Sequence, residues 1–397
     1  MKHGHCKRFH PPVQILVADG SHYYYNTEMK DEKTVTGGRT VSYRNIPLSA
    51  EEYSSAKLDV EWALDIISEY SSDEGDTAVD IERMAKYVRN WTKPENLSDV
   101  MGAPETETER IGQMWLSGGG KRWRPILTAA VFSTIGGTPE KIRKAALAVE
   151  CFHKASLIHD DIEDDDSRRY GQPTVHVRHG IPAAINAGDY LIGEGYRLLA
   201  CSGFKPDACI EMVKAASAGH RELCLGQGEE LSFCSRPQAV TEREVLRIYR
   251  RKTSAAFEVA LLVGAAAAGL DNDTCKALSK FSAAIGTAYQ IQDDVEDFCS
   301  EPGRAADMLA LRPTIFLALA CTSDNPEVQN SLKAAWQYNN RTKRTALIKA
   351  IENAGLHKRV ELLYSRYKLE AEHILAGINH PELQRLLRSV LNRMLQI

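Results

Sequence analysis

The stretch LIHDDIEDDDSRRYG (residues 157–171) places six carboxylates within seven positions, directly after an apolar run. Like charges this close repel one another, and a low-dielectric surrounding raises the cost. A second acidic run, YQIQDDVEDF, spans residues 289–298. Both runs contain the pattern Asp-Asp-x-x-Asp, so the chain concentrates negative charge at two matching places and must supply positive charge from elsewhere.

On a helix, the first and fifth residues of this pattern lie on one face, one turn apart. Asp160 with Asp164, and Asp293 with Asp297, are therefore expected to form two pairs of carboxylates. Mg²⁺ prefers all-oxygen, anionic ligands and bridges to substrate phosphates. Two such pairs that face each other across a helical bundle would hold a cluster of Mg²⁺ ions around a diphosphate.

A diphosphate also needs converging cations, and the chain offers three groups beside glycines or inside helical patterns. They are Lys121, Arg122 and Arg124 in GGGKRWRP, Arg168 and Arg169 after the first acidic run, and Lys252 with Thr253 in RRKTSAAFEVA. His153 precedes Asp160 by seven residues, on the same helical face. A lone histidine there is also typical of a packed core residue.

Bulk composition narrows the class of protein. The 397 residues are 43% hydrophobic, which is enough for a substantial core. The 49 basic and 53 acidic residues give a formal charge of −4, so binding to nucleic acid or to a membrane surface is not indicated. Nine cysteines without a CxxC pair predict reduced, buried thiols. With no apolar signal segment and no transmembrane stretch, we expect a soluble cytoplasmic protein.

Helix-period apolar spacing dominates after about residue 48, and convincing period-two segments are absent there. This pattern predicts an all-α bundle. Before residue 48, VQILVA predicts a short strand and TVTGGRTVSY a turn between β-forming residues. We predict an N-terminal extension over residues 1–75, ending in a helix, and an all-α domain over residues 76–397. The extension's His3, His5, Cys6 and His10 lack a recognised zinc spacing, so a metal-free terminus is favoured.

Taken in order, these landmarks resemble those of the trans-isoprenyl diphosphate synthases, the head-to-tail prenyltransferases that include farnesyl, geranylgeranyl and polyprenyl diphosphate synthases. The resemblance covers about residues 76–397. Its landmarks are GGKRWRP, HKASLIHDDIED, RYGQPTVH, AINAGDYL, GQGEEL, KTSAAFEVA, YQIQDDVED and ADMLALRPT. It implies an isoprenoid-synthase-type bundle with two Asp-rich motifs facing a central cavity. It also implies Mg²⁺, isopentenyl diphosphate and an allylic diphosphate as ligands, and a homodimer.

The resemblance also implies roles for individual residues. The Mg²⁺ ligands that hold the allylic diphosphate would be Asp160, Asp161, Asp164, Asp293, Asp294 and Asp297. The residues on that same diphosphate would be Arg169, Lys252 and Gln290, and those of the isopentenyl diphosphate pocket Lys121, Arg124 and His153, with Arg122 beside them. Charge building on the departing diphosphate is stabilised by the metal and the cations, while Thr253 and Gln290 stabilise the allylic cation. No protein nucleophile is needed.

Two departures from the family pattern concern the diphosphates. The family carries a second arginine before the glycine of its Arg-Arg-Gly stretch, which reaches isopentenyl diphosphate, but this chain has Tyr170. Arg168 or Arg178 is a candidate replacement. Nearer the C-terminus, the usual lysines are replaced by Arg304 and Arg312, which keep the charge and are expected to contact substrate.

The apolar residues before the first acidic run bear on product length, because the growing chain is expected to run down that helix. Ala155 and Ser156 are small where farnesyl-producing relatives often place an aromatic residue, and Phe152 is the first bulky candidate for a floor. We therefore predict a product of C20 or somewhat longer.

Two alternative functions stay open. A class I terpene cyclase shares the all-α fold and Mg²⁺, but its second metal motif is normally an Asn/Asp, Ser/Thr, Glu pattern, whereas this chain has a second Asp-Asp-x-x-Asp. A non-catalytic synthase subunit tends to lose one of the aspartate pairs, and both are present here. The sequence therefore favours a chain-elongating synthase.

Overall fold

The computed structural model describes residues 13–16, 22–25, 81–235, 238–299, 305–338 and 340–395. The chain divides into two compact units, one over Met1–Gly75 with Ile397 and one over Asp76–Gln396. In the first, β1 (Val13–Leu16) pairs antiparallel with β2 (His22–Tyr25), which confirms the strand predicted in VQILVA. The predicted helix before residue 75, the TVTGGRTVSY turn and the four N-terminal metal candidates lie outside the described residues.

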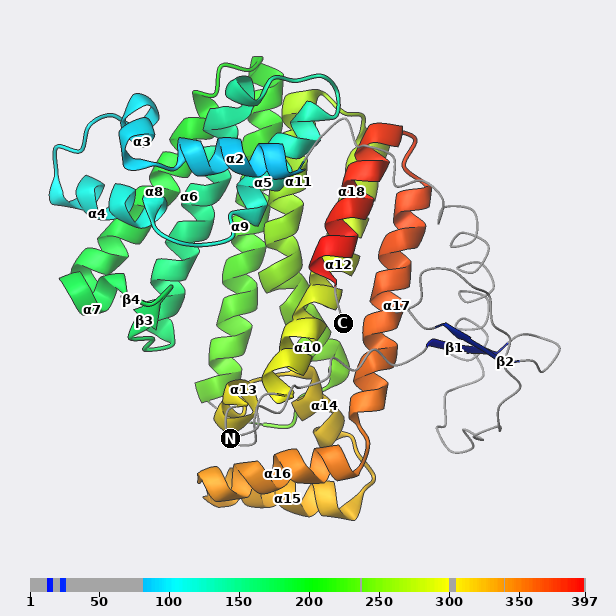
Figure 1. The fold of residues 1–397 in the computed structure, drawn as a ribbon. Helices are drawn as coiled ribbons and strands as arrows, with labels where there is room; N and C mark the ends of the chain where they lie inside the picture. The colour runs from blue at the N-terminus through cyan, green and yellow to red at the C-terminus, as the bar shows by residue number, and fades with distance from the viewer. Residues whose placement is uncertain are drawn as a thin grey trace, which may run out of the picture. The chain divides into compact units, whose positions relative to one another are not determined.

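The second unit is all-α, as predicted. Its long helices lie side by side, with α6 packed on α8, α9 on α11, and α12 on α17 (Figure 1). These helices are α6 (Pro139–Glu163), α8 (Ile181–Ala200), α9 (Pro206–Ser235), α11 (Ala255–Ala268), α12 (Asn272–Phe298) and α17 (His357–Ala376). Small residues line many of the contacts, so the helices approach closely around a continuous buried core.

Shorter helices cover one end of these long ones. They are α2 (Ile81–Trp91), α3 (Pro94–Met101), α4 (Glu107–Ser117) and α5 (Trp123–Ser133). The start of α4 is fixed by a capping box, in which Thr106 accepts from the Glu109 amide while the Glu109 carboxylate accepts from the Thr106 amide. Helix α5 packs between α6 and α11, and the loop between α4 and α5 carries the glycine-rich basic segment.

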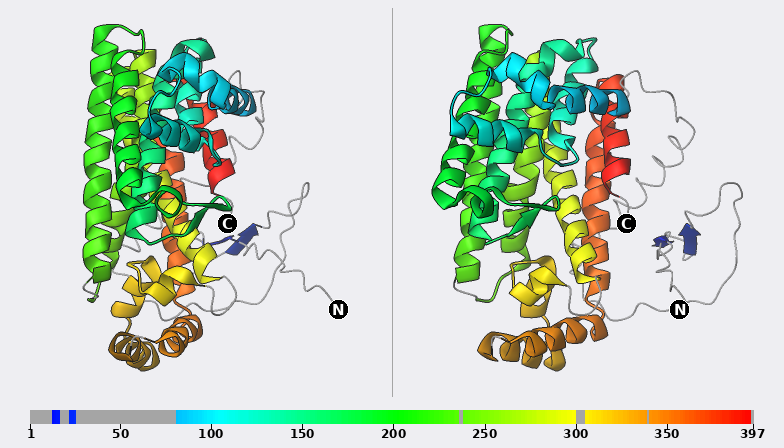
Figure 2. Two further views of the ribbon diagram at one scale, coloured as in Figure 1. Left: turned by 90° about the vertical axis from the view of Figure 1, so that its left-hand side faces the viewer. Right: turned by 60° about the vertical axis from the view of Figure 1, so that its left-hand side comes forward.

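Later helices close the other end. They are α10 (Glu242–Tyr249), α13 (Ala306–Ala310), α14 (Ile315–Cys321), α15 (Pro326–Tyr338) and α16 (Arg341–Asn353). The last helix, α18 (Pro381–Met394), instead packs on α17 and α5, at the end where α2 lies. Helices α15 and α16 pack together as a pair at the base of the bundle (Figure 2). Arg344 of α16 donates to the carbonyl of Leu309, so this pair is tied to α13.

A small hairpin interrupts the helices in a place where the sequence indicated no strands. β3 (Arg168–Arg169) pairs antiparallel with β4 (Gln172–Pro173), and α7 (Val175–His179) follows. The two loop residues, Tyr170 and Gly171, have φ values of 52° and 76°. Positive φ at both central positions is what a type I′ turn requires. Each strand of this hairpin has only two residues, which is too short to show alternating polarity in the sequence.

Two expectations about the whole chain can be compared with the described residues. None of their helices is long and apolar enough to cross a membrane. The eight described cysteines are free, but only Cys151 is buried, and four of them are exposed. The prediction of buried thiols is therefore wrong for most of them, because apolar helical spacing does not distinguish an inner face from an outer one at helix ends.

Candidate active site

The first acidic run lies at the C-terminal end of α6. Asp160 is half-buried, and burial raises the pKa of its carboxyl to about 6. The charge of Lys252 opposes this rise in pKa. Asp164 is the C-cap of the helix and forms an ion pair with Arg312, with 2.9 Å between Oδ1 and Nη2. The first and fifth residues of the run thus differ: Asp164 is paired, and Asp160 has no hydrogen bond or ion pair to any described residue.

The second run lies at the C-terminal end of α12 and repeats this division. Burial, followed by the nearby Glu296, raises the pKa of Asp293 to about 7, and its carboxylate has no hydrogen-bond or ion-pair partner among the described residues. Asp297 accepts from the backbone amides of Ala306 and Asp307 at 2.9 and 3.1 Å. An ionised carboxylate without a partner is costly at such a position, so Asp160 and Asp293 are suited to a cation.

The middle aspartate of each run points to protein partners instead. Asp161 is buried and accepts from Arg169, whose guanidinium also lies 3.4 Å from Asp166. Asp294 is 4% exposed and accepts from the Tyr249 hydroxyl and, at 2.8 Å, from the amide of Ile315 at the start of α14. Burial raises the pKa of Asp294 to about 7. Their predicted role as metal ligands stays a prediction.

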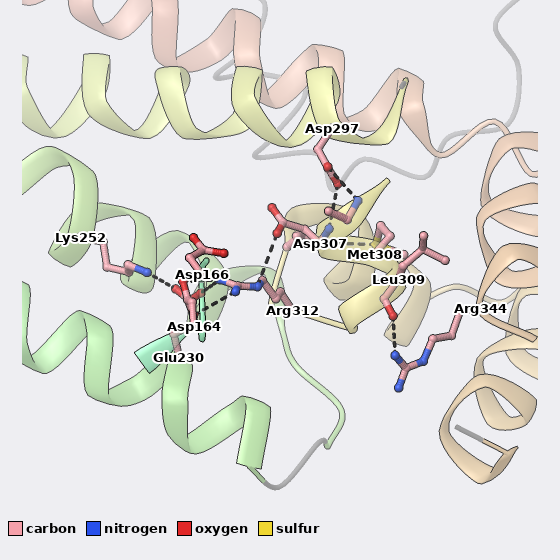
Figure 3. A network of polar contacts seen from close by, with 12 residues as sticks. Asp164, Asp166, Glu230, Lys252, Asp297, Asp307, Met308, Leu309, Arg312 and Arg344 are labelled. Carbon is pink, nitrogen blue, oxygen red and sulfur yellow. Dashed lines mark hydrogen bonds and ion pairs between the residues drawn. The ribbon is translucent and has the colours of Figure 1, made fainter. Parts of the chain in front are cut away.

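Lys252, expected on the allylic diphosphate, and Arg312, expected to contact substrate, belong to one polar network with carboxylates (Figure 3). Lys252 pairs with Glu230 of α9. Arg312 contacts Glu230 at 3.2 Å and Asp307 at 3.5 Å, besides Asp164. Burial lowers the pKa of Arg312, but the nearby carboxylates, above all Asp164, outweigh burial and raise it. The network brings Lys252 and Arg312 to the first acidic run, while Arg304 lies outside the described residues.

The glycine-rich loop separates its three basic residues. Lys121 is exposed, and Arg124 lies 3.3 Å from the Nε2 atom of His153. Burial, and then the charge of Arg124, lowers the pKa of His153 well below its usual value, so this imidazole is neutral. Arg122, in contrast, is buried, pairs with Glu150 and donates to the Gly118 carbonyl. Its guanidinium is committed to the protein, and its predicted contact with substrate stays a prediction.

A π-helical turn, Arg250–Ser254, carries Lys252 and Thr253. Such turns are rare and frequent at functional sites. Thr253 donates to the Oε1 atom of Gln290 at 2.6 Å. Two glycines make room for the wide turn, because a Cβ on Gly226 would lie 2.6 Å from Cβ of Arg251, and one on Gly286 would lie 2.6 Å from Cα of Ser254.

Gly226→Ala is therefore expected to lower the free energy of unfolding by about 1–3 kcal/mol, the usual cost of overpacking a tight contact. Gly228, on the same helix, has nothing within 4 Å of an added Cβ. Gly228→Ala should leave stability unchanged or raise it by up to about 1 kcal/mol, through helix propensity. Denaturant unfolding of both variants tests this, and equal effects would show that the close approach is not what requires Gly226.

A cavity of about 400 Å³ lies between α6, α8, α9 and α11. Asp160, Lys252 and Thr253 lie in its lining, together with Arg124 and His153. Along α6, the lining residues include Asp160, Ser156, Phe152 and Val149, which lie on successive turns over roughly 16 Å. The cavity thus has a charged end and an apolar end.

The residues predicted to set product length are placed differently by the structure. Phe152 and Ser156 line the cavity, and the Phe152 ring packs edge-on against Tyr196, with 4.9 Å between centroids. Ala155 is fully buried and is not among the lining residues. The lining continues to Val149 beyond Phe152, so the ring lies along the cavity wall. Asp293 is not in this lining either. The charge of Lys121 acts on its carboxyl and opposes the rise in pKa that burial causes.

The sequence model of the polyprenyl synthetase family matches residues 105–354 of the chain. The chain belongs to this family.

Among curated proteins, the chain is 35% identical over 204 residues to geranylgeranyl pyrophosphate synthase of Geoglobus acetivorans. That match covers 51% of this chain and 64% of the relative, so the chain spans less than two thirds of that relative's length. It is 31% identical over 310 residues to heptaprenyl diphosphate synthase component 2 of Geobacillus stearothermophilus, covering 74% of this chain and 94% of the relative. The solved geranylgeranyl pyrophosphate synthetase of Geoglobus acetivorans superposes with a TM-score of 0.67 and 26% identity, covering 81% of this chain and all of that one.

Sequence reasoning missed the acidic partners of the site's cations. Glu230 lies within the GQGEEL landmark and Asp307 within ADMLALRPT, but nothing in their spacing indicates a shared arginine. It also missed the π-helical turn, because periodicity does not register one extra residue in a turn. Within the described residues, no three His, Cys, Asp or Glu side chains converge closely enough to hold a metal ion by themselves.

Proposed function

We propose that this protein catalyses the Mg²⁺-dependent head-to-tail condensation of isopentenyl diphosphate with an allylic prenyl diphosphate, giving a trans-prenyl diphosphate of C20 or longer. The observation that carries this proposal is the cavity between α6 and α11, which has Asp160, Lys252 and Thr253 at one end and apolar residues along α6. A diphosphate suits the charged end and a prenyl chain suits the apolar one. The printed names of the relatives, which include geranylgeranyl and heptaprenyl diphosphate synthases, agree with this substrate class.

The donor set of the two acidic runs fits Mg²⁺. Asp160 and Asp293 are raised in pKa by burial, and neither has a partner among the described residues. Their fifth-position neighbours, Asp164 and Asp297, lie one helical turn away. All four offer carboxylate oxygens, the ligand type that Mg²⁺ prefers, with the diphosphate completing the coordination. When bound, Mg²⁺ would neutralise charge that builds on the leaving diphosphate.

The protein's own groups then have three tasks. Lys252, Arg169 and Arg312 bind the allylic diphosphate and stabilise it as the carbon–oxygen bond breaks. Thr253 and Gln290, held together by their hydrogen bond, direct oxygen dipoles at the allylic cation. Lys121, Arg124 and neutral His153 hold isopentenyl diphosphate so that its double bond attacks that cation, after which a proton leaves to the released diphosphate. The apolar end of the cavity keeps water from the cation.

A single assay tests the proposal. Purified protein is incubated with Mg²⁺, labelled isopentenyl diphosphate and a C5, C10 or C15 allylic primer, and the products are sized. We expect isopentenyl-dependent chains of C20 or longer. Consumption of the primer to a hydrocarbon without isopentenyl diphosphate would instead indicate a terpene cyclase. No turnover with any primer, together with an altered product from an added synthase, would indicate a subunit, as the name component 2 of one relative suggests for that protein.

Phe152→Ala should lengthen the main product by at least one isoprene unit, because it removes a ring that narrows the cavity beside Tyr196. Ser156→Phe, one turn nearer Asp160 and also in the lining, should shorten it. Product sizing by chromatography with both variants checks the pair. An unchanged product from both would show that another wall of the cavity sets the length.

The assembly and location belong to the same proposal. We infer a homodimer from the family resemblance and a cytoplasmic location from the free cysteines. The boundary near residue 75 likewise stays a prediction, and sedimentation of the full chain would test the dimer.

A further inference from the structure

A second, smaller cavity of about 180 Å³ lies beside the hairpin that carries Tyr170. Its wall includes Trp115 of α4, the backbone of Gly118 and Gly119, and α7. Three cationic side chains, Lys154, Arg169 and Arg178, also line it. The cavity therefore gathers positive charge next to the loop that leads into Lys121, although Lys121 itself is not in the lining.

Lys154 is the most unusual of these cations. Its side chain is 1% exposed, and its ammonium group donates to the carbonyls of Gly118 and Gly119. It lies 5.5 Å from the ring centroid of Trp115 and 4.7 Å from that of Tyr170. No carboxylate of the described chain lies within ion-pair distance of it. A buried ammonium without an anionic partner is costly, and an anion in the adjoining cavity would remove that cost.

Arg178, in the same lining, also has no carboxylate partner in the described part of the chain, although its side chain is exposed. Its guanidinium contacts the sulfur of Met114 at 3.7 Å. Arg169 differs, because Asp161 and Asp166 already pair with it. Arg168, the other candidate replacement for the missing arginine, donates to the Gly171 carbonyl and is not in the lining. Two of the three cations in the lining thus have no carboxylate partner among the described residues.

Tyr170 closes this arrangement. Its left-handed backbone in the type I′ turn lays the ring on the glycine loop, since a Cβ on Gly119 would lie 3.0 Å from the ring and one on Gly120 would lie 3.1 Å from the hydroxyl. The ring also packs on the Lys154 ammonium. Tyr170, which stands where the family has an arginine, thus holds the lysine of α6 in place.

We propose that this cavity binds the diphosphate group of isopentenyl diphosphate through Lys154 and Arg178, in place of an arginine at position 170. This inference rests on the proposed function for the identity of the ligand. Lys121 follows the lining residue Gly119 by two positions in the chain, so a diphosphate in this cavity lies beside the basic segment assigned above to the same ligand.

The test is calorimetric titration of the full chain with isopentenyl diphosphate in a metal chelator, so that Mg²⁺-dependent binding at the aspartates does not contribute. Lys154→Met and Arg178→Met should each weaken binding about tenfold, as expected for loss of a charge-assisted contact. Arg168→Met is the matched control and should change the Kd less than about twofold. The double variant Lys154→Met/Tyr170→Arg should recover most of the affinity lost in Lys154→Met, whereas a merely structural lysine would not be replaced in this way.

Thermal unfolding shows which variants are folded, and Arg178→Met, at an exposed position, remains informative if Lys154→Met is unstable. A Kd within twofold of wild type for Arg178→Met, or no recovery in the folded double variant, would overturn the proposal. The two proposals fail separately. Turnover with an unchanged KM for isopentenyl diphosphate in the variants refutes this cavity alone, whereas Lys154-dependent binding without any turnover refutes the proposed reaction alone.

Discussion

Asp160→Asn is expected to lower kcat by about 1,000-fold or more, close to 4 kcal/mol of transition-state stabilisation. Asparagine keeps the size of the side chain and removes the negative charge. Asp160 has no carboxylate-neutralising partner among the described residues, so its charge is available to a metal ion. Steady-state kinetics with Mg²⁺, isopentenyl diphosphate and a C15 primer measure the effect.

The folded state should not lose stability from this change. Because burial raises the pKa of Asp160 to about 6, the stability that its neutral form contributes is present below the ordinary value of 3.8 and is lost as the pH rises through about 6. At neutral pH without metal, the neutral amide is expected to leave the free energy of unfolding unchanged or raise it. A loss of activity caused by misfolding would therefore be recognised by denaturant unfolding.

Asp165→Asn in the same acidic run is the matched control. Asp165 is exposed and has a φ of 55°, a left-handed conformation that asparagine tolerates well. We expect kcat within about twofold of wild type. Equal losses in both variants would mean that the run acts through its total charge, and the assignment of Asp160 to a metal-binding pair would be wrong.

Asp294→Ala is expected to lower the free energy of unfolding by about 2 kcal/mol, since it leaves the buried Tyr249 hydroxyl without an acceptor for its proton and leaves the Ile315 amide with the Tyr249 oxygen alone. Its neighbour provides the contrast. Asp293→Ala removes a carboxylate without a described partner and should cost less than about 0.5 kcal/mol, while reducing kcat as Asp160→Asn does. Denaturant unfolding of the two variants, with kinetics in parallel, measures this separation.

The pH dependence of that loss has a definite sign. Burial raises the pKa of Asp294 to about 7, so the stability it contributes is fully present below 3.8 and declines as the pH rises through the folded value. The difference between wild type and Asp294→Ala should therefore be larger at about pH 5.5 than at about pH 8. If the stability difference between wild type and Asp294→Ala grew with pH, or if Asp293→Ala destabilised the protein equally, the role of Asp294 as the buried acceptor at the start of α14 would be contradicted.

The sequence was sufficient for the features that depend on period and order. Apolar spacing predicted the helices after residue 81, and the two Asp-Asp-x-x-Asp runs fell at the C-terminal ends of α6 and α12. The same spacing also separates the aspartates within each run. On a helix the second residue of the pattern is turned by about 100° from the first, which is why Asp161 and Asp294 face protein partners.

The remainder depended on contacts between distant segments. Arg122 and Arg124 stand two residues apart in one basic segment, yet one pairs with Glu150 and the other lies beside His153. A left-handed backbone at Arg122 turns its side chain inward, and spacing does not encode such a turn. Likewise, Lys154 stands in the HKASLIHDDIED landmark without a role that its spacing would indicate, and only the packing of Tyr170 on the glycine loop points to one.

In the proposed diphosphate site, binding of an anion would be an exchange of counter-ions. Lys252, Arg169 and Arg312 are each already matched with a carboxylate of the protein. An incoming anion must therefore outcompete an internal counter-ion at each cation before it can bind. A singly charged or weakly charged competitor gains too little to do so, whereas a diphosphate that brings its own divalent cations satisfies the cations and the displaced carboxylates together. Selectivity for diphosphates over monophosphates would then arise because the ligand competes with the protein's own carboxylates for these cations, and it would not require a pocket that fits the diphosphate by shape.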